Sequence, residues 1–221
     1  MDLRVFPRTV LSETTEKLRN AIVCGYFKPG SRLVEADLCR KMRVSRTSIR
    51  EALRRLEAEK LVTIVPNKGP SVAEIGWTEA QEIYEVRALL EGEAAALFAV
   101  RATADEVAQL RMALDDLARV ASSRDPMERL KAKSAIYDVI LVGCRNALIR
   151  EVLEGLLARI TFLRGRSMSR PGRISHTQRE LHRMYLAILK RKPEAARRAA
   201  VEHVQAARRA AQEVFKSRIS A

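Results

Sequence analysis

Three residues with side chains suited to reading base pairs lie close together in the first quarter of the chain. Arg46, Thr47 and Arg50 follow Ser45, a residue type that often caps the start of a helix. A guanidinium offers two parallel donors that match O6 and N7 of guanine, and a threonine can bond a phosphate or touch a thymine methyl. The spacing predicts a capped helix that presents these side chains on its first two turns.

The elements around these residues predict a helix-turn-helix. A helix over Ser45–Glu59 is expected because its apolar residues recur every three or four positions. A shorter helix over Val34–Lys41 precedes it, and a turn over 42–44 joins the two. Arg54 falls on the same polar face as the three residues above. The apolar positions of the second helix are Ile49, Ala52, Leu53 and Leu56.

A β-hairpin is expected directly after this helix pair. Leu61–Val65 is short and β-branched, Ser71–Ile75 alternates, and Pro66–Gly69 between them has turn chemistry. Lys68 would stand at the tip of the hairpin, where it could reach a phosphate or the minor groove. The segment therefore resembles the wing of a winged helix.

The rest of the chain predicts a helical bundle. We place a boundary near Ile75–Trp77, with an N-terminal domain over residues 7–75 and a second domain over 77–215. Thr78, Thr103, Asp125 and Ser175 are predicted N-caps, and Pro193 is predicted to open the last helix. The fold class is mainly α, with a helix over Ser12–Cys24 before the helix-turn-helix and an antiparallel bundle of about six helices after the hairpin. The predicted bundle helices are Thr78–Ala102, Thr103–Ser122, Pro126–Cys144, Ala147–Ser167, His176–Lys190 and Glu194–Lys216.

Composition narrows the class of protein. The chain has 221 residues, of which 47% are hydrophobic, and its longest apolar run, Ala94–Val100, is far shorter than a membrane span. No long apolar stretch opens the sequence and the three cysteines are far apart, so we expect a cytoplasmic protein without membrane contact. The net charge of +14 favours a polyanionic partner, although residues 159–221 hold 16 basic and 4 acidic residues and carry most of the excess. We interpret those distal arginines mainly as a solvated face.

The first domain is similar to the winged helix of the GntR family of transcription regulators. The resemblance rests on Arg32–Glu35, Leu38, Val44–Glu57 and Pro66–Gly69, and covers about Pro7 to Ile75. It implies that Arg46, Thr47 and Arg50 read double-stranded operator DNA, and that Gly69 lets the wing tip approach it. The family often has glycine where Arg43 stands and proline where Ser48 stands. A positive φ at Arg43 would cost about 1 kcal/mol.

The second domain resembles the FadR-like subgroup, whose C-terminal FCD domain is an effector-binding helical bundle. The motifs are Ile83–Arg87 with Glu91, then Asn146, then Pro193–Ala196 ahead of His203. They imply an effector site that includes Arg87, Asp138, Asn146 and His203. A pocket that holds basic residues without a metal would suit a small organic acid, bound through charge-assisted hydrogen bonds.

Many members of this subgroup bind a divalent metal through an Asp, a His four residues later and two His of the last two helices. Here Ser134 and Asp138 stand at the first two positions, Leu181 at the third and His203 at the fourth. A one-residue gap before Pro193 would bring His182 into place, giving a zinc-like partial site of Asp138, His182 and His203. Without the gap His182 lies about 100° away around the helix and no metal binds. Both alternatives stay open at this point.

Together these patterns predict a ligand-responsive transcription regulator and not an enzyme. It would bind a near-palindromic operator as a homodimer, as a repressor in the commoner mode of the family. Two alternatives remain: a metal-dependent hydrolase that uses Asp138, His182 and His203, or a basic protein that binds nucleic acid without sequence preference.

Overall fold

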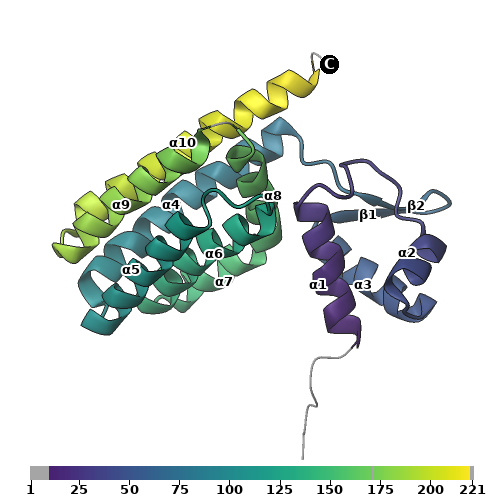
Figure 1. Cartoon of the computed structure of the whole chain (residues 1–221), viewed down its shortest axis with the longest axis horizontal. Coiled ribbons are helices and arrows are strands. Elements are labelled where there is room, and N and C mark those ends of the chain that lie inside the picture. The colour runs from purple at the N-terminus through teal and green to yellow at the C-terminus, as the bar shows by residue number, and fades with distance from the viewer. Residues whose placement is uncertain (1–9, 171, 220–221) are drawn as a thin grey trace, which may run out of the picture. The chain divides into compact units, whose positions relative to one another are not determined.

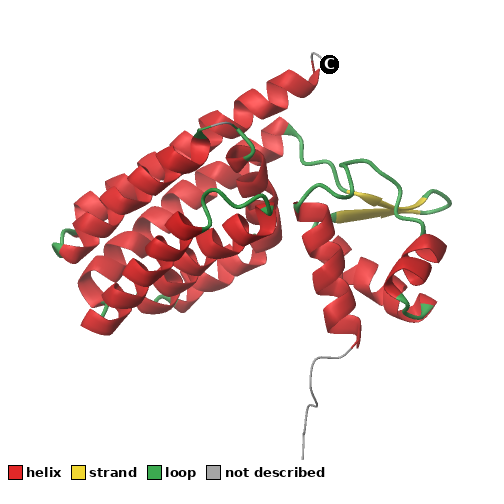
Figure 2. Ribbon diagram, viewed as in Figure 1, coloured by secondary structure: helices red, strands yellow, loops and turns green. Residues whose placement is uncertain are grey.

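The computed structural model describes residues 10–170 and 172–219, with side chains up to residue 216. The chain divides into two compact units, Met1–Ile75 and Gly76–Ala221 (Figure 1). Residues 7–9 of the expected N-terminal domain lie outside the described residues. The architecture is mainly helical, with a winged helix-turn-helix first and a helical bundle second, as the fold class predicted (Figure 2).

The first unit is a three-helix core with a hairpin. α3 contributes the apolar face to this core, because Ile49, Ala52, Leu53 and Leu56 are all less than 2% exposed. α1 packs against α3 through Leu18 and Ile22, which are equally buried. The elements are α1 (Val10–Val23), α2 (Glu35–Met42), α3 (Arg46–Ala58), β1 (Val62–Val65) and β2 (Gly69–Val72).

The hairpin pairs β1 and β2 in antiparallel register, with Val62 opposite Val72 and Val65 opposite Gly69. The second strand was predicted over Ser71–Ile75 but begins at Gly69, because the turn closes as soon as Lys68 N–H donates to Val65 O. Arg32 forms an isolated antiparallel bridge to Ser71, so the segment before α2 lies along the free edge of the hairpin.

The turn between α2 and α3 is held by local backbone geometry. Arg43 caps the C-terminus of α2 in the left-handed conformation, with φ 54° and ψ 45°, which confirms the positive φ expected there. Ser45 is the N-cap of α3, and its hydroxyl accepts the Ser48 N–H at 3.1 Å. The strain at Arg43, on the order of 1 kcal/mol, is tolerated because both helices bury an apolar face beyond the turn.

The second unit contains seven helices in its described part, one more than predicted. The predicted helix over Ala147–Ser167 is broken at Leu156, directly after Gly155, a residue type with low helix propensity. The seven are α4 (Trp77–Arg101), α5 (Ala104–Arg119), α6 (Pro126–Gly143), α7 (Ala147–Gly155), α8 (Leu157–Met168), α9 (Arg173–Leu189) and α10 (Pro193–Ile219).

The caps confirm some predicted helix starts and correct others. Thr103 and Glu106 form a capping box at α5, and Asp125 caps α6 ahead of a proline. Thr78 and Ser175 are not caps: α4 starts one residue before Thr78, and α9 starts two residues before Ser175. In both cases a glycine precedes the first helical residue. α10 begins at Pro193 as predicted.

The bundle is built around α4, which packs along α10 and also contacts α6, α7 and α9 (Figure 1). Small residues on α4 allow this close approach: a Cβ at Gly92 would lie 2.9 Å from Val201 of α10. Ala94, Ala95 and Ala99 on the same helix are fully buried. No helix in the described ranges is long and apolar enough to cross a bilayer.

Candidate nucleic-acid interface and candidate ligand site

The polar face of α3 is open to solvent. Arg46, Thr47, Arg50 and Arg54 are all exposed, whereas Ile49 between them is fully buried. A helix cap and an apolar face therefore fix which side chains can point away from the core. The four residues predicted to contact DNA from this helix share one accessible surface.

Acidic neighbours hold two of these arginines in the free protein. Arg50 Nε donates to Oε2 of Glu35 on α2 at 2.9 Å, and Arg54 lies 3.6 Å from Glu51. Both pairs are largely exposed, so each contributes about 0.2–1 kcal/mol.

The wing tip presents a cation on a tight turn. Lys68 is exposed, and the residues on both sides of it have positive φ: 63° at Asn67 and 78° at Gly69. Glycine adopts this conformation without steric cost. A Cβ at Gly69 would lie 3.9 Å from the guanidinium of Arg32, which therefore lies close to the tip.

A second concentration of polar groups lies inside the bundle. We call it the buried polar cluster; its members come from five helices and are all less than 10% exposed. The members are Tyr84, Arg87 and Glu91 of α4, Lys133 and Tyr137 of α6, Arg164 of α8, Arg173 and Glu180 of α9, and His203 of α10.

Two carboxylates divide the cluster into linked ion pairs. Arg87 Nε donates to Glu91 at 2.8 Å, and Arg164 lies 3.7 Å from the same carboxylate. Arg173 donates from both terminal nitrogens to Glu180, at 3.0 and 2.8 Å. The Arg164 guanidinium also lies 4.1 Å from the ring centroid of Tyr137.

Among the described residues, only one ring nitrogen of His203 has a hydrogen-bond partner. Its Nδ1 lies 2.6 Å from Glu180 Oε2. Burial and the nearby positive charge of Lys133 lower the pKa of His203 to about 3, although the Glu180 contact opposes this shift. Burial would raise the pKa of Glu180, but hydrogen bonds from His203 and Arg173 outweigh it and lower that pKa to about 2. A neutral ring thus donates from Nδ1 to a carboxylate, and Nε2 keeps a lone pair.

Several buried polar atoms of the cluster have no hydrogen-bond partner among the described residues. Four are nitrogens of arginine and lysine side chains, and the others are the imidazole Nε2 of His203 and the hydroxyl oxygen of Tyr84. Such atoms cost free energy unless something bonds to them. The four nitrogens are Arg87 Nη1, Lys133 Nζ, Arg164 Nε and Arg173 Nε.

The charge balance of the cluster favours an anion. It contains three arginines and two carboxylates, with His203 neutral and the pKa of Lys133 lowered by burial. A cavity of about 60 Å³ borders it on the α6–α7–α8 side, lined by Glu91, Tyr137 and Arg164 of the cluster and by Asp138 and Glu154 outside it. A small molecule with acceptor oxygens would satisfy the unpaired donors.

Two family models match this chain. The FCD domain model matches residues 82–206, and the model of bacterial regulatory proteins of the gntR family matches residues 11–72. The chain is a GntR-family regulator with an FCD domain. It is therefore a DNA-binding transcription regulator, and the family and its homologues are regulators rather than enzymes.

Named relatives agree with this membership. An uncharacterised HTH-type transcriptional regulator of Agrobacterium vitis is 34% identical over 137 residues, 61% of this chain and 80% of the relative. The galactonate operon transcriptional repressor of Escherichia coli is 27% identical over 219 residues, which are 89% of this chain and 94% of the repressor. The solved structure of E. coli McbR/YncC has the same fold, with a TM-score of 0.78 at 23% identity over 95% of this chain and 98% of McbR.

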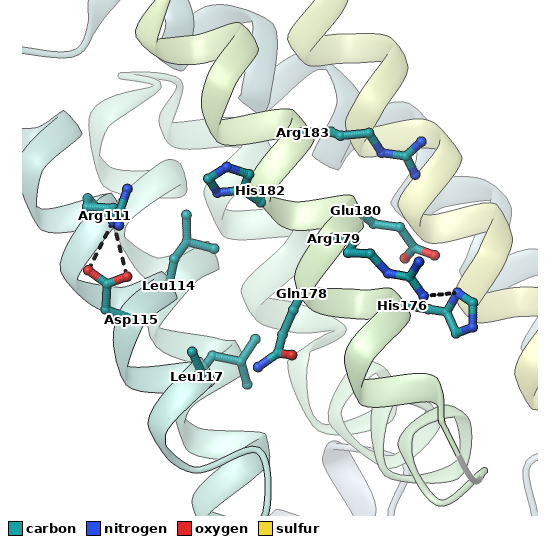
Figure 3. A pocket seen from close by; sticks show the side chains of 11 residues that line it. Arg111, Leu114, Asp115, Leu117, His176, Gln178, Arg179, Glu180, His182 and Arg183 are labelled. Atoms are coloured by element: carbon teal, nitrogen blue, oxygen red, sulfur yellow. Dashed lines mark hydrogen bonds and ion pairs between the residues drawn. The ribbon is translucent and has the colours of Figure 1, made fainter.

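The predicted partial metal site does not assemble in this GntR-family chain. His182 is exposed and lines a surface pocket of about 640 Å³ between α5 and α9, whereas His203 is fully buried and Asp138 borders the smaller cavity. Figure 3 shows His182 and Glu180 leaving α9 in different directions, His182 toward Arg111 and Glu180 toward α10. The one-residue gap that would turn His182 inward is wrong, since Leu181 holds the buried position.

The register assumed on α6 also needs correction. Ser134 and Asp138 were placed at the metal positions, but the side chains of α6 that are buried in the cluster are Lys133 and Tyr137, one residue earlier on each turn. Ser134 touches the cluster only at its edge, where its hydroxyl accepts a hydrogen bond from Arg164 Nη1 at 3.3 Å. The described residues contain no group of three His, Cys, Asp or Glu that could hold a metal ion. The donor set does not fit a divalent metal.

The surface pocket beside α9 is basic but open. Arg111 is paired with Asp115 at 3.0 Å, and Arg179 lies 3.2 Å from Nδ1 of His176 (Figure 3). Glu180 forms part of its wall and also belongs to the buried polar cluster. The pocket therefore reaches the edge of the cluster from the α5 side.

The predicted effector residues fall in different places. Arg87 and His203 lie in the buried polar cluster, and Arg87 is paired with Glu91. Asp138 lies only at the outer wall of the small cavity, where burial raises its pKa. Asn146 does not enter the cluster: its side chain accepts the Ile149 N–H and caps α7.

Sequence reasoning missed most of the cluster. Arg164 and Arg173 belong to the basic distal segment that was interpreted as a solvated face, yet both are nearly inaccessible to solvent. One signal was present on α6: Leu130, Lys133, Tyr137 and Ile140 recur at helical spacing and form its buried stripe. A lysine inside such a stripe indicates a charge directed into the core.

Proposed function

We propose that this regulator is a repressor that binds a near-palindromic operator as a homodimer and responds to a small carboxylate. The effector would occupy the buried polar cluster. The observation that carries this proposal is the excess of buried arginines over carboxylates, with a nitrogen on each of Arg87, Arg164 and Arg173 that has no partner in the described chain.

A carboxylate fits the donors that the cluster leaves free. Arg87, Arg164 and Arg173 each keep an unpaired N–H after their contacts to Glu91 and Glu180. Charge-assisted hydrogen bonds to these groups are shorter and stronger than neutral ones. One relative is named for repression of a galactonate operon, and galactonate is itself a carboxylate.

The DNA half of the proposal rests on α3 and the wing. Arg46, Thr47 and Arg50 would contact base edges in the major groove. Ser45, Arg54 and Lys68 would bind the DNA backbone, and Gly69 would let the wing tip come close to it. One such module contacts few bases, so two copies on adjacent half-sites are needed for a specific site. An effector that favours one dimer geometry would change the spacing of the two modules.

Operator binding is tested with Arg46→Ala and Arg50→Ala. Each should weaken binding of the genomic operator fragment by roughly 10- to 100-fold in fluorescence anisotropy, because a bidentate base contact is lost. Arg119→Ala, on exposed α5, is the control and should bind normally. Equal binding of both variants would refute the role of α3, and equal binding of an unrelated duplex by the wild type would favour a non-specific nucleic-acid binder.

Effector response is tested by adding small organic acids and their amides to the protein–operator complex. Release of DNA by an acid and not by its amide is the expected result, because the amide lacks the negative charge. A complex that resists every acid at millimolar concentration would contradict the carboxylate effector and leave operator recognition intact.

A further inference from the structure

Lys133 is the most unusual member of the buried polar cluster. Its side chain is fully buried and Nζ has no hydrogen-bond partner in the described part of the chain. Lysine is almost never fully buried without a partner. The next lysine toward the N-terminus, Lys131, is exposed, so α6 directs one of the two residues into the core by its rotation alone.

The surroundings of Lys133 are mainly cationic. Burial lowers its pKa well below 10.5, and the charges of Arg164, Arg87 and Arg173 lower it further, while Glu91 opposes them. The titratable groups that face this space are Tyr84, Arg87 and Glu91 of α4, Tyr137 of α6, Arg164 of α8, Arg173 and Glu180 of α9, and His203 of α10. The buried residues of α5 and α7 are apolar.

Lys133 also acts on His203, the histidine of the cluster. It is close enough to His203 for its positive charge to lower the pKa of the imidazole, and that imidazole has a free Nε2. His203 is the one residue of the expected metal set that lies in the cluster, and Leu181, which holds the buried position on α9, has no donor atom for a metal. Lys133 can instead add a positive charge to the three arginines when it is protonated.

We infer that Lys133 replaces the metal ion as the cation that binds the effector, and that its amine takes up one proton from the solvent buffer as the anion enters. This inference rests on the proposed carboxylate effector and adds its mode of recognition. Without ligand, the amine is favoured because the three arginines already outnumber the two carboxylates. An incoming carboxylate cancels that excess, accepts a charge-assisted hydrogen bond from the ammonium and so favours the protonated form.

The coupling between proton uptake by Lys133 and binding of the anion has a definite direction. The anion binds the protonated form of Lys133 more tightly, so affinity should fall as pH rises above the depressed pKa. Proton uptake should be small at low pH and approach one proton per site at high pH. Removal of the amine abolishes both effects, because the three guanidiniums remain charged over the whole range.

The experiment uses the full-length protein with acetate, malonate and sulfate as probe anions, and acetamide and malonamide as uncharged controls. Thermal shifts are measured for wild type, Lys133→Met and Lys131→Met, with and without EDTA. We expect a probe anion, and not its amide, to stabilise the wild type and Lys131→Met. The shift should survive EDTA, and Lys133→Met should bind the same anion about 10- to 100-fold more weakly.

Titration calorimetry in Tris and in HEPES then measures proton uptake for the anion that stabilises most. Wild type should show a binding enthalpy that depends on the buffer and an affinity that falls as pH rises, whereas Lys133→Met should show neither. Without any anion, Lys133→Met should melt higher than wild type, since the methionine fills the same space without an unpaired buried donor.

Three results would overturn the inference. If the anion binds Lys133→Met as tightly as wild type, Lys133 has no part in recognition, and the carboxylate-responsive regulator stands without it. If EDTA abolishes the shift, a metal binds the anion instead. If none of the probe anions stabilises wild type while operator binding is intact, both Lys133 and the carboxylate effector are wrong.

Discussion

Arg50 on α3 donates from Nε to both carboxylate oxygens of Glu35 on α2, at 3.2 and 2.9 Å. The contact joins the two helices of the helix-turn-helix through the residue best placed to read a base. It engages Nε and leaves Nη1 and Nη2 for a bidentate contact to guanine. Glu35 can therefore hold the guanidinium in place while Arg50 binds DNA.

Glu35→Gln should lower specificity rather than affinity as a whole. Loss of the carboxylate frees the Arg50 side chain and also removes a negative charge that repels phosphates. We expect the ratio of operator to unrelated-duplex affinity to fall by roughly 3- to 10-fold, as the energy of an exposed pair allows. Glu51→Gln is the matched control, because its pair with Arg54 is longer, at 3.6 Å. An unchanged ratio would show that Glu35 does not position Arg50.

Lys68→Ala at the wing tip should weaken operator and unrelated duplex alike. A lysine that contacts a phosphate releases about one counterion, so the slope of log affinity against log salt should decrease by about 1. Lys131→Ala, on the exposed face of α6, should leave the slope unchanged. A loss confined to the operator sequence would mean that Lys68 reads a base instead.

Acid should destabilise the bundle through His203. Its pKa is about 3 in the folded protein, against 6.5 for the ordinary side chain, so the unfolded chain binds more protons between these values. Stability must therefore fall as pH drops from 6.5 toward 3, by about 1.4 kcal/mol per pH unit for one proton.

The measurement is urea unfolding of wild type and His203→Gln between pH 7 and pH 4. The variant should be less stable at pH 7, and the difference should shrink as pH falls because glutamine does not titrate. His182→Gln, on the exposed side of α9, controls for the loss of a histidine. Parallel stability curves for wild type and His203→Gln would contradict a buried neutral imidazole.

Two glycine substitutions in the bundle should have opposite signs. A Cβ at Gly143 would lie 2.4 Å from Cε2 of the fully buried Phe98 ring, so Gly143→Ala should cost roughly 1–3 kcal/mol. At Gly155 nothing lies within 4 Å of the added Cβ, and alanine there should stabilise α7 by about 0.5–1 kcal/mol. Thermal unfolding of the two variants checks both signs, and a stabilising Gly143→Ala would refute the close α4–α6 packing.

The sequence by itself determined the DNA-reading unit almost completely. Ser45, the apolar positions from Ile49 to Leu56 and the turn at Pro66–Gly69 act through neighbours a few residues away, and such local rules are visible in one segment. The same rules found the helices of the second unit and the caps at Thr103 and Asp125. The same rules did not predict the break between α7 and α8 at Leu156, because the residues on either side give only a weak signal that a helix ends there.

Only the tertiary structure decided what lies inside the bundle. The buried polar cluster draws side chains from five helices, and a rotation of one residue, about 100°, separates Lys133 from Ser134 and Leu181 from His182. Packing of α6 and α9 against α4 and α10 sets those rotations. For this reason the basic distal segment, which looked like a solvated surface, supplies the two arginines, Arg164 and Arg173, that make the interior a site for an anion.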